Sequence, residues 1–120
     1  MKVSYKNNKL EKICTNLESL LKKYKDQKLA DDIYLRLIQL HDFAHLWDIK
    51  NLRDANLHSL KGKRKYELAI DAESWWKRWK RRIIFEQVNG ENVSDDWRNH
   101  KKFETVTEIK LLEISEHYKK

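Results

Sequence analysis

The sequence has very little of several residue types. Its 120 residues include no proline, two glycines and a single cysteine, Cys14. Apolar runs are only two or three residues long, which excludes a membrane span, because such a span needs about 20 apolar residues. One cysteine excludes an internal disulfide and fits a reducing compartment. Since the region after Met1 has no apolar stretch of signal-peptide length, we expect a cytoplasmic protein.

Basic residues are abundant, and most of their excess lies in one segment. Lys and Arg number 26 against 19 Asp and Glu, for a net charge of +7. Residues 61–82 contain nine basic and three acidic side chains, so this segment alone carries +6. Such a concentration is typical of proteins that bind a polyanion, although a basic hairpin that only aids solubility gives the same pattern.

Three tryptophans, Trp75, Trp76 and Trp79, are interleaved with these cations. Indole rings stack on unpaired bases while Lys and Arg contact phosphates, and each stacked base contributes about 1–3 kcal/mol. Tryptophans also pack on sheets and anchor protein partners. The pattern therefore favours RNA contact no more than packing against the core or against a protein partner.

Hydrophobic periodicity predicts two helices in the first third of the chain. Apolar residues recur at spacings of three and four over residues 10–24 and again over 29–40, which is typical of amphipathic helices. Asn7 or Asn8 can cap the first helix, and Asp26 can cap the second. The apolar face of the second helix includes Ile38 and is the broader of the two, so we expect that helix to be more buried.

Strand patterns surround and follow these helices. Residues 2–5 and 65–71 alternate polar and apolar side chains, and we expect the second of these strands to be half-buried, with Tyr66 facing inward. Residues 82–88 are rich in β-branched side chains and end at the turn dipeptide Asn89-Gly90. Apolar residues over 105–114 switch parity, which predicts burial on both faces or a β-bulge. The chain is expected to be one α+β domain, residues 1–120, with an antiparallel sheet and a helical hairpin on one face.

Five short segments carry a resemblance to a known family. They are residues 9–15, 57–65, 69–71, 82–86 and 112–118. In this order they resemble HigB-type killer toxins of the RelE/ParE superfamily of bacterial toxin–antitoxin modules. The resemblance implies a RelE-like small antiparallel sheet with two helices laid across it. It also implies ribosome-dependent cleavage of mRNA without metal or cofactor, which inhibits translation.

The same resemblance implies the partners. These are mRNA and the ribosome, and a HigA-like helix-turn-helix antitoxin encoded beside the toxin. Operator DNA would be contacted only through the antitoxin complex, and no membrane partner is implied.

The family's motifs fall on particular residues of this chain. The pattern His-x-Leu-Lys-Gly falls on residues 58–62, and the arginine that opens the third strand falls on Arg82. The family's closing Asp-Tyr-His corresponds to Glu116-His117-Tyr118, with the last two residues in swapped order. The candidate RNA-binding residues are Lys61, Lys63, Arg64, Lys77, Arg78, Trp79 and Arg82.

The implied chemistry uses the RNA 2′-hydroxyl as the nucleophile. It requires a base for the hydroxyl proton, an acid for the leaving 5′-oxygen and cations for the charged transition state. Imidazole titrates near working pH, so His58 is expected to share the proton transfers with Glu116, His117 or Tyr118. Each histidine has an alternative interpretation as an ordinary surface residue. The site therefore requires the middle of the chain to converge with its end beside the cations.

Other interpretations stay open at this point. His41 and His45 have helical i,i+4 spacing, but no further ligand follows at a suitable distance in sequence, so no metal site is expected. A ParE-like toxin that acts on DNA gyrase without cutting RNA is one alternative. A catalytically degenerate domain that only binds its antitoxin and operator DNA is another.

Overall fold

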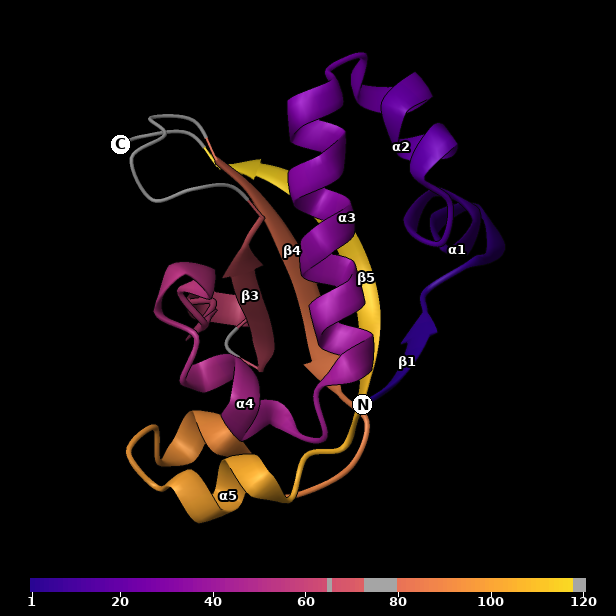
Figure 1. Ribbon diagram of the computed structural model, residues 1–120. Coiled ribbons are helices and arrows are strands. Elements are labelled where there is room, and N and C mark those ends of the chain that lie inside the picture. Colours follow the sequence, from indigo (N-terminus) through magenta and orange to yellow (C-terminus); the bar gives the residue numbers. More distant parts are fainter. Residues whose placement is uncertain (65, 73–79, 118–120) are drawn as a thin grey trace.

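The computed structural model describes residues 1–64, 66–72 and 80–117 (Figure 1). The strands are β1 (Lys2–Tyr5), β2 (His58–Ser59), β3 (Glu67–Asp71), β4 (Lys80–Gln87) and β5 (Glu108–His117). The helices are α1 (Asn8–Cys14), α2 (Leu17–Tyr24), α3 (Gln27–Asp42), α4 (Leu46–Lys50) and α5 (His100–Glu104). Short 3₁₀ turns are η1 (Arg53–Ala55), η2 (Gly62–Arg64) and η3 (Val93–Asp95). No helix in the described ranges is long and apolar enough to cross a bilayer.

The five strands form one sheet in the order β1-β5-β4-β3-β2. The α+β class is confirmed, but the prediction of an antiparallel sheet is wrong at one edge. β1 pairs in parallel with β5, from Lys2 opposite Glu108 to Tyr5 opposite Leu111, whereas the other pairs are antiparallel. Alternation in a sequence identifies a strand and its buried face but says nothing about the direction of its neighbour, which is why the sequence missed this parallel pair.

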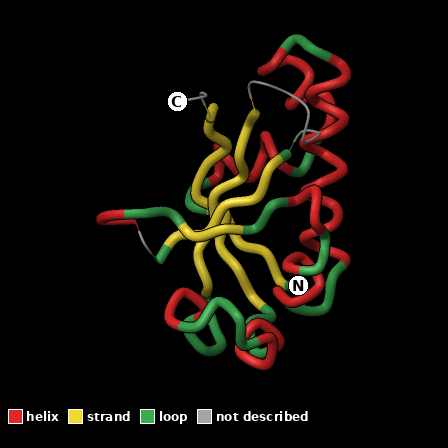
Figure 2. The backbone as a smooth tube through the Cα atoms, turned by 90° about the vertical axis from the view of Figure 1, so that its left-hand side faces the viewer, coloured by secondary structure: helices red, strands yellow, loops and turns green. Residues whose placement is uncertain are grey.

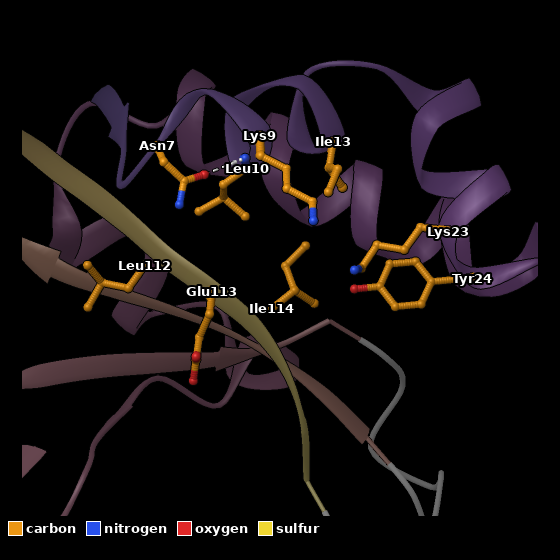
Figure 3. A pocket seen from close by; sticks show the side chains of 9 residues that line it. All are labelled: Asn7, Lys9, Leu10, Ile13, Lys23, Tyr24, Leu112, Glu113 and Ile114. Carbon is orange, nitrogen blue, oxygen red and sulfur yellow. Dashed lines mark hydrogen bonds between the residues drawn. The ribbon is translucent and has the colours of Figure 1, made fainter.

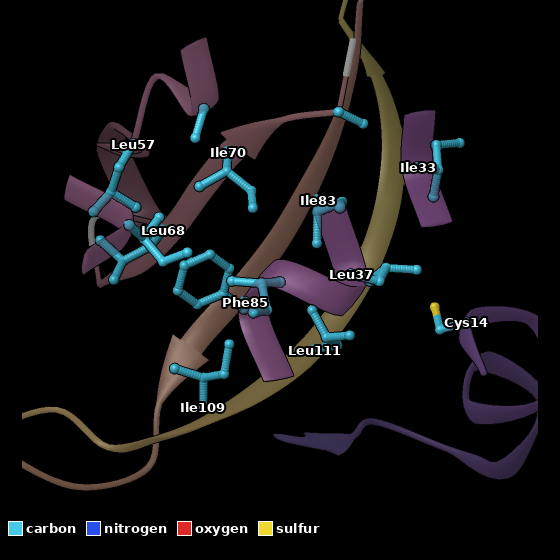
Figure 4. Close-up of a cluster of buried hydrophobic side chains, with 14 of the residues drawn as sticks. Cys14, Ile33, Leu37, Leu57, Leu68, Ile70, Ile83, Phe85, Ile109 and Leu111 are labelled. Carbon is cyan, nitrogen blue, oxygen red and sulfur yellow. The ribbon is translucent and has the colours of Figure 1, made fainter. Parts of the chain in front are cut away.

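Helix α3 crosses one face of the sheet, and the core lies between them (Figures 1 and 4). The apolar side chains of the inner three strands meet Ile33 and Leu37 of α3 there; they are Leu68, Ile70, Ile83, Phe85, Ile109 and Leu111. Figure 2 shows η2, which ends at Arg64, projecting from the opposite side of the sheet. The two faces of the sheet are therefore covered differently.

The predicted first helix is broken into two. Asn16 lies between α1 and α2, and its side-chain oxygen accepts hydrogen bonds from the backbone N–H groups of Glu18 and Ser19 at 2.9 and 3.3 Å. Thr15 caps the end of α1, and its hydroxyl donates to the Glu11 carbonyl at 2.7 Å. Thr and Asn side chains compete with the helical backbone for hydrogen bonds in this way. The apolar period of the sequence therefore continues across a point where the helix is interrupted. The cap predicted at Asn7 is confirmed by its 2.8 Å bond from Leu10 N–H.

Helix α3 is the more buried helix, as predicted, and Asp26 caps it. Its buried stripe differs in two residues from the prediction. Ile38 is 39% exposed, whereas Arg36 is only 8% exposed. Arg36 lies at the helical spacing that faces the sheet, and its Nε–H donates to the Asp71 carbonyl at 2.9 Å. A charged side chain is tolerated in the stripe because its donors find acceptors.

Strand β3 is more buried than its alternation suggested. Leu68, Ala69, Ile70 and Asp71 are all buried, and Tyr66, expected to face inward, is 58% exposed. The pattern was wrong because the two faces of an inner strand are both covered here. In β5 the structure shows a bulge, one of the two predicted alternatives. Ile84 pairs with Glu113 and Phe85 with Leu111, which leaves Leu112 as the extra residue.

The turn predicted at Asn89-Gly90 follows β4 but does not make a tight hairpin. η3 and α5 intervene before β5 begins. Asn89 joins the ends of this connection, because its side-chain oxygen accepts from the N–H groups of Thr107 and Glu108 at 3.0 and 3.1 Å. Helices α4 and α5 were not predicted from the sequence, since five residues are too few to establish a helical period.

The two glycines provide a matched test of this connection. Gly90 has φ +81°, and a Cβ placed there would lie 2.5 Å from the Thr105 carbonyl oxygen; Gly62 has φ +70° and open space around it. Gly62→Ala should cost about 1–2 kcal/mol of unfolding free energy from the left-handed backbone alone. Gly90→Ala should cost roughly 2–4 kcal/mol, because the backbone must also move. Urea unfolding of both variants checks this, and equal costs would contradict the close contact.

Alkaline conditions should weaken the fold through Cys14 and Tyr5. Burial raises the pKa of the Cys14 thiol from 9.0 to about 11. Burial, with smaller contributions from Cys14 and Glu11, raises the pKa of Tyr5 to about 12. Both groups keep their protons longer in the folded state, so their stabilisation is complete below pH 9 and falls as the pH rises from about 9 to 12. Urea midpoints measured across this range should fall as the pH rises. Cys14→Val should remove the part of this fall that lies between pH 9 and 11.

Candidate functional site

His58 lies on the face of the sheet that points away from α3, here called the distal face. Residues directly opposite each other on paired strands share a face. His58 pairs with Ala69, Ala69 with Ile84, and Ile84 with Glu113. Two-residue alternation along the strands extends the set, so the distal face comprises His58, Glu67, Ala69, Asp71, Arg82, Ile84, Glu86, Lys110, Glu113 and Ser115.

The hydrogen bond of His58 determines its tautomer. Its Nδ1 lies 2.7 Å from the Asn56 carbonyl oxygen, which can only accept, so Nδ1 carries the proton. In the neutral ring, Nε2 then holds a lone pair. Nε2 is buried and has no hydrogen-bond partner among the residues that the structure describes. An unsatisfied buried nitrogen costs about 1–3 kcal/mol, so a ligand that donates a hydrogen bond to Nε2 would recover this energy.

Asn56 sets the orientation of this ring. It follows η1 with φ +51°, a left-handed conformation that asparagine tolerates better than most residues. Its carbonyl faces His58, and its side-chain Nδ2 donates to Asp71 Oδ2 at 3.2 Å. Asn56 therefore links the imidazole on β2 to the carboxylate of Asp71 on the adjacent strand, β3.

Asp71 is the centre of the site. It is 2% exposed, its carbonyl accepts from Arg36, and its Oδ1 lies 4.0 Å from Arg82 Nε. Asp71 and Arg82 are also paired in register between β3 and β4. Buried carboxylates need such partners, because an unpaired buried charge is strongly destabilising. His58, Asn56, Asp71 and Arg82 thus form one connected polar network.

Two members of this network, Asn56 and Asp71, were not predicted from the sequence. Asp71 was assigned to the solvent side of a half-buried strand. Its one visible signal is a carboxylate that directly follows the apolar run Leu68-Ala69-Ile70 and precedes Ala72. Asn56 carries no signal of its own, because an asparagine two residues before a histidine is common in loops.

Arg64 of η2 reaches across the distal face. Its guanidinium contacts Glu67 Oε1 at 2.6 Å and Glu113 Oε1 at 3.2 Å. Glu67 belongs to β3 and Glu113 to β5, so the side chain spans β4 between them. Hydrogen bonding to Glu67 raises the pKa of Arg64. Exposed ion pairs of this kind contribute only about 0–1 kcal/mol, so a phosphate can replace either carboxylate.

The other predicted RNA-binding residues have different positions. Arg82 is in the network described above, and Lys61 is exposed just before η2. The backbone of Lys63 is part of η2. Lys77, Arg78 and Trp79, together with Trp75 and Trp76, lie outside the described residues, as does the predicted catalytic residue Tyr118.

The structure does not bring the end of β5 to His58. The backbone of Glu116 pairs with Arg81 and that of His117 with Lys80. β5 and β2 are three strand spacings apart, about 14 Å, and Glu116 lies a further three residues, about 10 Å, along β5 from the level of His58. The strand order that sets this backbone separation is not visible in the sequence, and the meeting of His58 with these side chains stays a prediction.

A hollow lies between the first helices and β5 (Figure 3). It has a volume of about 210 Å³ and is lined by Asn7, Lys9, Leu10, Ile13, Lys23, Tyr24, Leu112, Glu113 and Ile114. β1 pairs with β5 only as far as Leu111, so the next residues of β5 face this hollow instead of a strand. Its apolar floor and its two lysines, Lys9 and Lys23, distinguish it chemically from the distal face.

The remaining histidines have structural contacts. His41 Nε2 lies 3.0 Å from the Tyr5 hydroxyl, His45 caps α4, and the His100 ring lies 5.2 Å from that of Trp47. No group of three or more His, Cys, Asp or Glu side chains in residues 1–64, 66–72 and 80–117 is arranged to hold a metal ion.

Comparison with known proteins identifies no family for this chain. No protein-family model matches the chain, and no curated protein matches it either. The resemblance to HigB-type toxins therefore depends on the five sequence segments alone.

Proposed function

We propose that this protein is a cytoplasmic RelE-like toxin of a toxin–antitoxin module, an endoribonuclease that cuts mRNA on the ribosome without a metal. The observation that carries the proposal is the lone pair of His58 Nε2 on the distal face, in one network with Asp71 and Arg82. The net charge of +6 on residues 61–82 supports a polyanionic substrate. The resemblance of five segments to the HigB family supports the same activity.

In the proposed mechanism, RNA binding first uncovers His58 Nε2, which is buried in this structure, and Nε2 then takes the proton of an RNA 2′-hydroxyl. The 2′-oxygen attacks the adjacent phosphorus, the bond to the 5′-oxygen breaks, and that oxygen takes a proton from water. The products are a 2′,3′-cyclic phosphate and a 5′-hydroxyl. Arg82, with Asp71 fixing its position, stabilises the charge that develops on the phosphate, and Arg64 adds a second cation.

This mechanism assigns the proton abstraction to His58 and does not require Glu116, His117 or Tyr118. The backbones of His58 and Glu116 are separated by three strand spacings and three further residues, so the proposal assigns the proton abstraction to His58 alone. The expected partnership between His58 and these terminal residues is therefore not part of the proposal.

The partner in this proposal is a HigA-like antitoxin encoded beside the toxin. The hollow between α1, α2 and β5 is suited to an extended antitoxin segment, since the edge of β5 beyond Leu111 offers backbone groups for strand addition. Leu10, Ile13 and Ile114 would receive apolar side chains, and Lys9 and Lys23 would receive carboxylates. Operator DNA would be bound through the antitoxin.

The test is cleavage of an end-labelled mRNA on translating ribosomes in the presence of EDTA. We expect cuts in the ribosomal A site with 2′,3′-cyclic phosphate ends. Intact mRNA would overturn the nuclease assignment. In that case, growth arrest with inhibited DNA supercoiling would indicate a ParE-like toxin, and expression without arrest would indicate a catalytically degenerate co-repressor.

A further inference from the structure

An exposed aromatic ring borders a second cavity at the end of the distal face where β3 begins and β4 ends. Tyr66 is 58% exposed, and the cavity beside it has a volume of about 210 Å³. Tyr66, Glu86, Gln87, Gly90 and Asn92 line it. An aromatic ring beside polar side chains is the composition that single-stranded RNA sites use to hold an unstacked base.

The rim of this cavity is held in place by internal hydrogen bonds. Gln87 donates to the Glu91 carbonyl at 2.7 Å, and its side-chain oxygen accepts from Val93 N–H at 3.1 Å. Asn92 accepts from Ser94 N–H at 2.9 Å. These two side-chain amides are therefore hydrogen-bonded within the loop that follows β4, and they form one side of the cavity.

Glu86 is the polar group of the cavity that remains available. It has no hydrogen bond or ion pair with another residue of the described ranges. Its neighbours across the strands are Glu67, which is paired with Arg64, and Lys110 of β5, with which Glu86 forms no ion pair in the structure. The Glu86 carboxylate can accept two hydrogen bonds from a ligand that presents two adjacent donors.

We propose that this cavity is a base-recognition subsite for guanine, in which Tyr66 stacks on the base and Glu86 accepts hydrogen bonds from its N1–H and amino groups. Guanine presents two adjacent donors on its Watson–Crick edge. Adenine and cytosine place a ring acceptor next to their amino group, and uracil flanks its single donor with two carbonyls, so a carboxylate disfavours all three.

The subsite extends the proposed nuclease activity and rests on it for its biological meaning. Glu86 lies two residues along β4 from Ile84, which is level with His58 two strands away. This places the Glu86 and His58 backbones roughly 12 Å apart, a span of about two nucleotides. The guanine would therefore belong to a nucleotide near the scissile bond and would contribute to the choice of cleavage site.

Binding of mononucleotides to the full chain tests the subsite directly. In ¹H–¹⁵N NMR titrations, GMP should shift the amide signals of Gln87 and Gly90, with affinity about 5- to 100-fold above that for AMP, CMP or UMP. Tyr66→Ala should weaken GMP binding by a similar factor through lost stacking. Glu86→Gln should remove the preference for GMP. Leu35→Ala is the matched control, since Leu35 on α3 is also 58% exposed.

The outcomes separate the subsite from the nuclease activity. Equal binding of all four nucleotides, or GMP shifts confined to other residues, would overturn the subsite. Cleavage of mRNA at positions that Tyr66→Ala and Glu86→Gln leave unchanged would also overturn it while the nuclease activity stood. Selective GMP binding by a protein that leaves mRNA intact would support the subsite and overturn the nuclease.

Discussion

His58→Ala should lower the rate of mRNA cleavage on translating ribosomes by at least about 100-fold, since a positioned general base contributes roughly 10²–10⁴-fold. The variant removes the Nε2 lone pair and leaves Asp71 and Arg82 in place. Because His58 is on an edge strand of two residues, its loss should change the urea midpoint little. Quantitative primer extension on the cleaved mRNA gives the rates.

Two other histidines serve as controls for this result. His41→Ala should retain full activity, since His41 contacts Tyr5 at the end of α3. His117→Ala should retain most of it, because the register of β5 separates position 117 from His58. A loss in His117→Ala equal to that in His58→Ala would show that the chain end does reach the reacting phosphate. Full activity in His58→Ala would remove the proposed base.

Asp71→Ala should lower the free energy of unfolding by about 3–5 kcal/mol, the usual cost of removing one partner from a buried charged pair. Asp71 is almost fully buried, and its side chain accepts from Asn56 and lies beside Arg82. This is a large share of the roughly 5–15 kcal/mol that holds a typical domain together. Urea unfolding followed by circular dichroism measures it.

The double variant Asp71→Ala/Arg82→Ala separates pairing from packing. If the interaction between Asp71 and Arg82 causes the loss, the double variant should be less destabilised than the sum of the single variants. Asp42→Ala, an exposed carboxylate at the end of α3, should change stability by less than about 0.5 kcal/mol. Strict additivity of Asp71→Ala and Arg82→Ala would contradict a direct interaction between the two side chains.

Local features of the fold were predictable because they depend on neighbouring residues. The caps at Asn7 and Asp26 and the bulge in β5 follow from side-chain chemistry and from the two-residue period of a strand. The break at Asn16 is equally local, but the continuing apolar period of the helices concealed it. Short elements such as α5 hold too few residues for any period to be read.

The candidate site was predictable only in part. His58 and Arg82 were identified through the resemblance to HigB-type toxins. Asp71 was missed, because a carboxylate at the end of a strand is usually solvated, and its burial depends on Arg36 arriving from a helix 35 residues earlier. The residues next to Asp71 and Arg36 in the sequence give no indication of this contact.

By itself, the sequence determined the α+β class, the more buried helix and the segment that carries the excess charge. Only the tertiary structure decided that β1 joins β5 in parallel, that β2 and β5 lie three strands apart, and that Asp71 connects Asn56 to Arg82. The reason is that periodicity and capping arise from residues a few positions apart. Strand order and the pairing of buried charges arise from chain segments that meet only when the whole core forms.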